Sequence, residues 1–432
     1  MYVDKVTLKN IRGFESLEFD LSRGDGNYAG WTVFTGDNGA GKSTLLKAIA
    51  VALIGRDVAR SLQPSFHRWI REGAGEQEAK IELMIFPERG IDAFSEQGNT
   101  AYKKFPATVI LKVGGKDAGV ELPATSGSKT TLVHRGLWSA AARGWFSCGY
   151  GPFRRVFGAS QEATRLMVSP TTERFVTMFQ EAASLYEVDQ WLRNLSHKQL
   201  ERRSPESGQQ LDLLLEILRD ELMPNQITVD RVDSDGLWLK DRNGLQLAWG
   251  EMSDGYRAAL ALLADILRHL IAAYGIEGLA ERGVDGKMRI VRSGVVLIDE
   301  IDAHLHPEWQ REIGFWLKGH FPKIQFLVTT HSPIICQAAD KNGLFVLPEP
   351  GSGDAPRALT TDEYNKVISS RPDTILLTPA FGLQNTRSPR AVQGRVEYAK
   401  LMTKKRAGVR LSKDEESKVL QLQLFAITDE EP

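Results

Sequence analysis

The sequence predicts an α/β fold in which strands and helices alternate along both halves of the chain. In the first half, an expected strand over residues 31–35 runs directly into a glycine-rich turn and a helix of about 42–54. In the second half, an apolar strand over 294–299 precedes a helix from about Pro307, and a further strand over 324–329 precedes a short helix. A strand, a glycine loop and a helix in this order open the α/β folds that bind nucleotides.

Hydrophobic periodicity and turn signals predict the remaining elements of the first half. Residues 3–21 alternate and turn once, which predicts two strands around a loop at 10–14. Residues 79–150 contain further β-leaning segments between glycine-rich turns. From 171 to 222, apolar residues recur at three- and four-residue spacing, so we expect a helical insertion whose inter-helix loop lies at 202–208.

Strands are expected to return after this insertion. The segments ITVDRV, LWLKD and LQLAW are joined by Asp-Gly at 235–236 and Asn-Gly at 243–244, dipeptides that favour hairpins because they tolerate positive φ. A long helix should begin at about Asp254. From about Thr360 the sequence predicts a helical appendage with a Ser-x-x-Glu capping box at 412–415. No long heptad run is present, so we expect no long coiled-coil arm.

The charge balance narrows the classes of partner. In 432 residues, 54 Lys and Arg oppose 55 Asp and Glu, which gives a net charge of -1. This excludes a wholesale electrostatic footprint for nucleic acid or anionic membrane, and it confines any nucleic-acid contact to a groove or tail. Cys148 and Cys336 provide neither a spaced zinc pair nor a disulfide framework, which fits a reducing cytosol. Charged residues interrupt the apolar stretch 258–276, so we expect a cytoplasmic protein without a membrane span.

One motif carries specific chemical information. Residues 36–44 fit G-x-x-x-x-G-K-[ST] and lie between the expected strand and helix, as the motif requires. Its glycines let the loop curl so that successive N–H groups and the helix N-terminus face phosphates. Lys42 is expected to reach the β- and γ-phosphates of ATP, and the Ser43 hydroxyl to hold Mg²⁺. The candidate nucleotide-binding residues are Gly36, Asp37, Asn38, Gly39, Ala40, Gly41, Lys42, Ser43 and Thr44.

The apolar strand VVLIDE ends in two acidic residues. A buried parallel strand would deliver Asp299 beside the serine that holds magnesium, which makes Asp299 the second candidate metal ligand. Glu300 would then be placed to polarise the attacking water. The alternative is an acidic loop after an ordinary core strand.

Two further segments are candidates for contact with phosphates. Ser253 and Gly255, in MSDGY, open the long helix, where they would form a second anion-binding site, although Ser-x-Gly before a helix is usually an N-cap. His331 ends the strand IQFLVT, and its imidazole could hydrogen-bond the γ-phosphate. The alternative is that His331 caps the helix beginning at Ser332.

Taken together, VTLKNIRGF, GDNGAGKST, EMSDGY, VVLIDEIDAHLHP and FLVTTHSP resemble the motifs of the RecF/SMC-like branch of the ABC-type ATPases. The resemblance implies a P-loop NTPase head of two lobes with a mixed sheet. It also implies a homo-oligomer of at least two copies, with ATP between the phosphate loop of one subunit and the signature of another. The implied domains are an N-terminal part of the head at 1–165, a helical insertion at 166–225, a C-terminal part of the head at 226–348 and a helical appendage at 349–432.

The resemblance also implies roles for individual residues. Ser253 and Gly255 would act in trans, Glu300 would be the catalytic base, and His331 would be the switch histidine. Arg12, in the loop after the first strand, matches a family position near the nucleotide.

The sequence departs from the family pattern in two places. The signature reads MSDGY where the wider family has LSGGQ. This difference puts in question how strongly two subunits would close around ATP. No glutamine marks the Q-loop of the family. The segment 149–155 ends an expected strand in the right interval and could replace it, the alternative being an ordinary glycine–proline turn.

Two softer segments, FVTMFQEAASLYEVDQWL and ILLTPAFGLQNTRSPRAV, resemble the compact ATPase subunits of bacterial anti-phage systems of the Septu and retron-associated type. Such subunits lack a coiled-coil arm and work with a separate effector, often an HNH-type nuclease. The resemblance therefore implies an ATP-hydrolysing regulatory or sensor subunit.

Two other functions stay open. A RecF-like ATPase of DNA repair or DNA-end binding would use a basic groove, and basic residues between 387 and 410 could contact DNA or RNA phosphates, although they fit a solvated helix face equally well. An ATPase with a fused nuclease is disfavoured, because the segment after His331 has no acidic cluster typical of metal-dependent cleavage.

Overall fold

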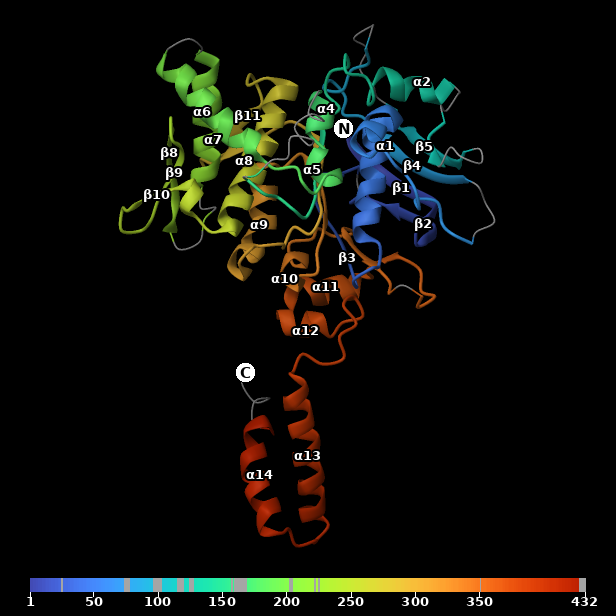
Figure 1. Ribbon diagram of the computed structural model, residues 1–432, viewed down its shortest axis with the longest axis vertical. Coiled ribbons are helices and arrows are strands. Elements are labelled where there is room, and N and C mark those ends of the chain that lie inside the picture. The colour runs from blue at the N-terminus through green and yellow to red at the C-terminus, as the bar shows by residue number, and fades with distance from the viewer. Residues whose placement is uncertain are drawn as a thin grey trace. The chain divides into compact units, whose positions relative to one another are not determined.

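A computed structural model describes residues 1–24, 26–73, 78–95, 103–114, 120–123, 128–156, 158, 169–201, 205–220, 223, 226–349 and 351–426. Contacts divide the chain into two compact units, residues 1–370 and 371–432 (Figure 1). Within the described ranges, no helix combines the length and the apolar character that crossing a membrane requires.

A six-stranded sheet with the order β16-β15-β3-β14-β13-β7 forms the centre of the first unit. Five of its strands run parallel, and β16 pairs antiparallel with β15. The predicted strands β3, β13 and β14 are confirmed, and every residue of β13 and β14 is buried, as in strands covered on both faces. The strands are β3 (Gly30–Gly36), β7 (Ser147–Tyr150), β13 (Gly294–Ile298), β14 (Ile324–Thr329), β15 (Leu344–Leu347) and β16 (Arg357–Ala358).

A second, antiparallel sheet has the order β2-β1-β4-β5-β6. Helix α1 (Lys42–Leu62) contacts strands of both sheets, and one hydrophobic cluster joins its side chains to the two sheets (Figure 1). This arrangement gives the mixed α/β architecture that the motifs imply. The strands of the second sheet are β1 (Tyr2–Ile11), β2 (Phe14–Asp20), β4 (Glu78–Phe86), β5 (Phe105–Val113) and β6 (Val120–Glu121), and the short helix α2 (Ser128–Arg135) follows them.

The helix expected over 42–54 continues further, but with a break. Gly55, at φ 77°, interrupts α1 immediately after Ile54. A Cβ at Gly55 would lie 2.8 Å from the ring of Trp138, whose indole N–H donates to the carbonyl oxygen of Ala52 at 2.9 Å. Glycine therefore lets the helix change direction around an indole from a distant segment.

Helices and a small sheet occupy the part of the first unit in which they were expected. The expected loop at 202–208 is wrong in part, because α7 begins at Pro205, and residues 202–204 lie outside the described ranges. Helices α6 and α7 pack against each other and against a three-stranded sheet with the order β10-β9-β8, which contains both predicted hairpins (Figure 1). The elements are α4 (Pro170–Glu173), α5 (Val176–Phe179), α6 (Tyr186–Leu200), α7 (Pro205–Arg219), β8 (Thr228–Asp233), β9 (Gly236–Lys240) and β10 (Gln246–Ala248).

The rest of the first unit returns to alternating helices and strands. The long helix α8 (Asp254–Tyr274) follows a 3-10 turn, η2 (Trp249–Glu251), and begins at the predicted residue. A hairpin that the sequence did not predict, β11 (Ala280–Arg282) and β12 (Met288–Ile290), precedes β13. The remaining helices are α9 (Pro307–His320), α10 (Pro333–Cys336) and α11 (Thr361–Ser369).

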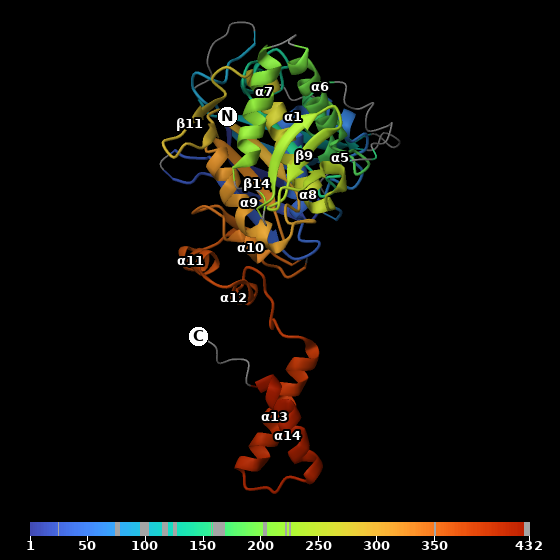
Figure 2. The ribbon, with the colours of Figure 1, turned by 90° about the vertical axis from the view of Figure 1, so that its left-hand side faces the viewer.

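The second unit is helical, with α12 (Pro372–Leu376), α13 (Pro389–Arg406) and α14 (Lys413–Ala426). Helices α13 and α14 pack side by side in Figure 1 and overlap in the turned view of Figure 2. The predicted capping box is confirmed: the Ser412 hydroxyl accepts from the Glu415 N–H at 3.2 Å, and the Glu415 carboxylate accepts from the Ser412 N–H at 3.0 Å.

Candidate nucleotide-binding site

The candidate residues gather at one edge of the parallel sheet. Strand β14 lies between β3 and β13, and the three run parallel in register, so their carboxyl ends meet at the same edge. The phosphate loop follows β3, His331 follows β14, and Asp299 and Glu300 follow β13. Ligands of open α/β sheets bind outside the carboxyl ends of the strands, so this edge is the expected position for a nucleotide.

The phosphate loop is held in its curled form by glycine conformations and by its own lysine. Gly36 has φ 144°, and a Cβ there would lie 2.2 Å from the carbonyl oxygen of Leu347, so a larger residue could not occupy the turn. Lys42 begins α1 and is only 6% exposed. Its Nζ donates across the loop to the carbonyl oxygens of Gly36 at 2.8 Å and Asp37 at 2.9 Å. The loop therefore presents a helix N-terminus and an ammonium group together.

Asp299 has the environment of a metal ligand. The side chain is buried, and its Oδ1 accepts a hydrogen bond from the Thr329 hydroxyl at 2.6 Å. Its Oδ2 is also buried but has no hydrogen-bond partner among the described residues. A buried carboxylate oxygen without a partner costs free energy unless a cation binds it. Together with the Ser43 hydroxyl, it supplies the oxygen donors that Mg²⁺ prefers, so these residues fit that ion.

Glu300 lies in a constrained turn immediately after Asp299. Its φ of 47° is in the left-handed region, which is uncommon for a residue other than glycine. Its N–H donates to the Thr329 hydroxyl at 2.7 Å, so one threonine orders both acidic residues. Burial lowers the pKa of Lys42, whereas the negative charges of Glu300 and Asp299 act to raise it.

His331 lies at the same edge of the sheet and is exposed. It does not cap the next helix, because Ser332 is the N-cap of α10 and accepts from the Ile334 N–H at 3.2 Å. Desolvation, and after it the positive charge of Lys42, lowers the pKa of His331, so its imidazole is neutral at neutral pH. A neutral imidazole near Lys42 retains one N–H that can donate to a phosphate oxygen.

Arg12 also belongs to this group. It lies in the turn between β1 and β2, and its Nη1 donates to the hydroxyl of Thr44 in the first turn of α1 at 3.3 Å. Its guanidinium carbon lies 4.9 Å from the centroid of the Trp69 ring. The structure thus brings Arg12 to the phosphate loop and adds an aromatic support that the motif pattern does not show, while its position near a nucleotide stays a prediction.

Ser253 and Gly255 lie apart from these residues. Ser253 takes the N-cap position of α8, but its exposed hydroxyl makes no capping hydrogen bond. Within the described part of the chain, no hydrogen bond or ion pair joins Ser253 to residues 36–44. The first turn of α8 carries Asp254, which pairs with Arg257 of the same helix.

Gly255 has a steric role within its own chain. A Cβ there would lie 2.2 Å from the carbonyl oxygen of His304, so the loop after β13 can approach α8 only at glycine. We predict that Gly255→Ala lowers the free energy of unfolding by about 1–3 kcal/mol, because backbone must move to relieve the overlap. Urea unfolding measures this. Gly250→Ala, at a position with nothing within 4 Å, is the control, and equal losses in both variants would contradict the steric role.

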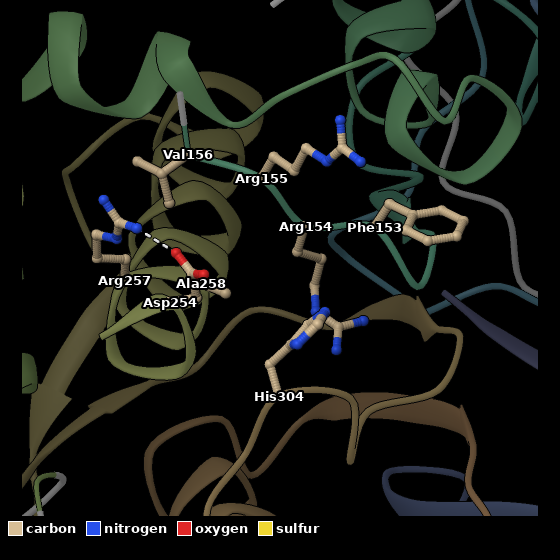
Figure 3. Close-up of a pocket in the computed structure, with 8 residues that line it drawn as sticks. All are labelled: Phe153, Arg154, Arg155, Val156, Asp254, Arg257, Ala258 and His304. Atoms are coloured by element: carbon tan, nitrogen blue, oxygen red, sulfur yellow. Dashed lines mark hydrogen bonds and ion pairs between the residues drawn. The ribbon is translucent and has the colours of Figure 1, made fainter. Parts of the chain in front are cut away.

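Sequence reasoning missed Arg154 as an individual site residue. It follows β7 within the segment 149–155 and is buried, and its guanidinium donates to carbonyl oxygens of the Asp299–Ala303 turn. Beside it is a pocket of about 410 Å³ (Figure 3). The pocket is lined by Phe153, Arg154, Arg155, Val156, Asp254, Arg257, Ala258 and His304. The only signal in the sequence was the position of this segment at the end of a strand.

Family models match both halves of the site. A model described as "AAA domain" matches residues 5–217, and one described as "AAA domain, putative AbiEii toxin, Type IV TA system" matches residues 175–337. Septu protein PtuA of Bacillus mycoides is 24% identical over 391 residues, which is 89% of this chain. A retron Ec83 probable ATPase of Escherichia coli is 39% identical over 119 residues, 28% of this chain. The chain is thus similar to P-loop ATPases of the RecF/SMC-like branch.

The chain spans less than half of the length of these two curated relatives. The alignments span 45% of the length of the Septu protein and 20% of the retron protein. Among solved structures, an SMC head bound to the C-terminal winged-helix domain of ScpA is 16% identical and has a TM-score of 0.47. That comparison covers 85% of this chain and 100% of the other.

Proposed function

We propose that this RecF/SMC-like ATPase binds and hydrolyses ATP with Mg²⁺ between two copies of the chain, and that the nucleotide state controls closure of the pair. The observation that supports this proposal is the division of the site. One chain gathers the phosphate loop, Asp299, Glu300 and His331 at a single sheet edge, but it leaves the Ser253 hydroxyl exposed and without a cap bond. A second copy would complete the site with its own α8.

Each residue has a proposed role that follows from its geometry. Residues 36–44 would bind the phosphates through backbone N–H groups, with Lys42 neutralising their charge. Ser43 and Asp299 would hold Mg²⁺, which neutralises charge on the phosphate oxygens when bound. Glu300 would accept a proton from the attacking water. His331 would donate a hydrogen bond to the γ-phosphate.

The biological setting we propose is anti-phage defence, with this chain as the regulatory or sensor subunit and a separate nuclease as effector. Support comes from the similarity to a Septu protein over 89% of this chain and to a retron probable ATPase over 28% of it. A nuclease or a reverse transcriptase encoded beside this gene would add support. A nuclease would be the separate effector that we propose, and a reverse transcriptase would indicate a retron.

Mixing two inactive variants tests whether the site is shared. Lys42→Ala removes the phosphate-loop cation, and Ser253→Arg blocks the start of α8. If each site is built from residues of two chains, a dimer of one chain of each variant keeps one intact site. That site is formed by the phosphate loop of the Ser253→Arg chain and by Ser253 of the Lys42→Ala chain. An equal mixture should therefore recover about a quarter of the wild-type hydrolysis rate, since half of the dimers are mixed and each has one good site of two.

A matched control uses two defects on the same side of the proposed interface. Mixing Lys42→Ala with Glu300→Gln should recover nothing, because both changes disable the half-site that one chain contributes. Recovery in this control, or none in the Lys42→Ala and Ser253→Arg mixture, would exclude a site shared in this way.

A further inference from the structure

Arg154 is a buried cation that bonds to backbone carbonyl oxygens. Its side chain is 6% exposed, although it carries a full charge. Its Nη1 donates to the carbonyl oxygens of Gly151 at 3.0 Å and Asp299 at 2.8 Å. Its Nη2 donates to the carbonyl oxygen of Glu300 at 2.9 Å and lies 3.4 Å from those of Ile301 and Ala303. One guanidinium therefore holds the whole turn that follows β13.

Backbone carbonyl oxygens, and not an ion pair with a described residue, compensate for the burial of the Arg154 charge. Among the described residues, no carboxylate lies within salt-bridge distance of Arg154, so carbonyl dipoles provide the compensation for its burial. Burial lowers the pKa of Arg154 to about 10, while the nearby charges of Asp299, Asp302 and Glu300 oppose that shift. The guanidinium thus stays charged at neutral pH.

Hydrogen bonds hold both backbone polar groups of Glu300. The N–H of Glu300 donates to Thr329, and the carbonyl oxygen of Glu300 accepts from Arg154. With both backbone groups held, the left-handed φ of Glu300 is maintained, and with it the direction in which its side chain leaves the backbone.

We propose that Arg154 is the positioning residue for Glu300, and that it holds the Glu300 carboxylate in the orientation that hydrolysis requires. This inference rests on the proposed function, because it assigns Arg154 to the same hydrolytic site. The planar guanidinium is suited to this role because it directs several donors into one plane and reaches consecutive carbonyl oxygens at once. A lysine ammonium has the same charge but not this geometry.

The test compares Arg154→Met and Arg154→Lys with the same changes at Arg155, an exposed neighbour that forms no ion pair with the described residues. Arg154→Met should lower kcat by about 30–100-fold, because a displacement of about 1 Å at a reacting group costs that much. The KM for ATP should stay within about threefold, since the phosphate loop is unchanged. Arg154→Lys should recover only part of the loss, and the Arg155 variants should keep the wild-type kcat.

A double-mutant comparison separates positioning from general damage to the fold. In a Glu300→Gln background, Arg154→Met should lower the residual rate by less than about twofold, because the residue through which it acts is already gone. An equal loss in both backgrounds, or an unchanged kcat in the wild-type background, would overturn the inference. If Arg154→Met does not fold, Arg154→Lys provides the same comparison with the charge retained.

The two proposals fail in different ways. If Glu300→Gln removes hydrolysis and the Arg154 variants do not, only the positioning role is wrong. If Glu300→Gln leaves hydrolysis unchanged, the proposed catalytic base is wrong, and the positioning role of Arg154 is overturned with it.

Discussion

Replacing Glu300 by glutamine is expected to lower kcat for ATP hydrolysis by about 10²–10³-fold, the size of effect that a positioned general base has. Glutamine has nearly the same shape but cannot accept the proton of the attacking water. The phosphate loop, Lys42 and Asp299 keep their contacts, so ATP binding should persist. The dimer closed around ATP should therefore accumulate.

Two measurements check this result. Steady-state phosphate release gives kcat, and size-exclusion chromatography with and without ATP reports the trapped dimer. Glu308→Gln, an exposed carboxylate in the first turn of α9, is the control and should retain the wild-type rate. Hydrolysis near the wild-type rate in Glu300→Gln, or a monomer in the presence of ATP, would contradict the proposed mechanism.

Replacing Asp265 by alanine is expected to lower the free energy of unfolding by about 3–5 kcal/mol, because it removes the carboxylate at the centre of a buried ionic network and leaves its hydrogen-bond partners unsatisfied. Asp265 lies on α8 and is 3% exposed. Its carboxylate accepts from the Tyr150 hydroxyl at 3.0 Å and from Arg268 Nε at 2.9 Å, and it pairs with His269 at 3.2 Å. Since Tyr150 ends β7, this network ties α8 to the parallel sheet.

Protonation of the same carboxylate should make the free energy of unfolding depend on pH. Burial acts to raise the pKa of Asp265, but His269 and Arg268 overcome it and hold the pKa well below its ordinary value. A carboxyl group whose pKa is depressed on folding stabilises the fold above its unfolded pKa of about 3.9, and this contribution is lost as pH falls below that value. Wild type should therefore lose stability on acidification below about pH 4, and Asp265→Ala should lose less.

Urea unfolding at pH 7 and at pH 3 measures both effects. Asp285→Asn is the control, because Asp285 forms an exposed pair with Arg289. An exposed pair contributes about 0–1 kcal/mol, so this variant should change little. A loss below about 1 kcal/mol for Asp265→Ala would show that the buried network is dispensable.

The local sequence was sufficient to predict the elements whose geometry is set by a few neighbouring residues. The phosphate loop, the apolar strands β13 and β14, and the hairpins of β8 to β10 were predicted because glycine patterns, apolar runs and Asp-Gly turns act over a few residues. The bend at Gly55 and the short strand β15 were not predicted. Their causes are Trp138 and strand β3, which are far away in the sequence.

The residues of the candidate site also differ in whether the sequence alone could locate them. Lys42 and Asp299 could be located from residue type and spacing, whereas the contacts of Arg154 are with carbonyl oxygens some 145 to 149 residues further along the chain. Backbone carbonyl oxygens carry no sequence signature, so no motif could reveal this arrangement. Thr329, which orders both acidic residues, was likewise hidden within an apolar strand.

The place of β14 between β3 and β13 has a consequence for synthesis of the chain. The phosphate loop and the acidic turn cannot be joined through the sheet until residues 324–329 have left the ribosome. At roughly 5–20 residues per second, that delay after Lys42 lasts some tens of seconds. A nascent chain would therefore carry its phosphate loop without the rest of the site, and nucleotide could be bound productively only once nearly all of the first unit has been made.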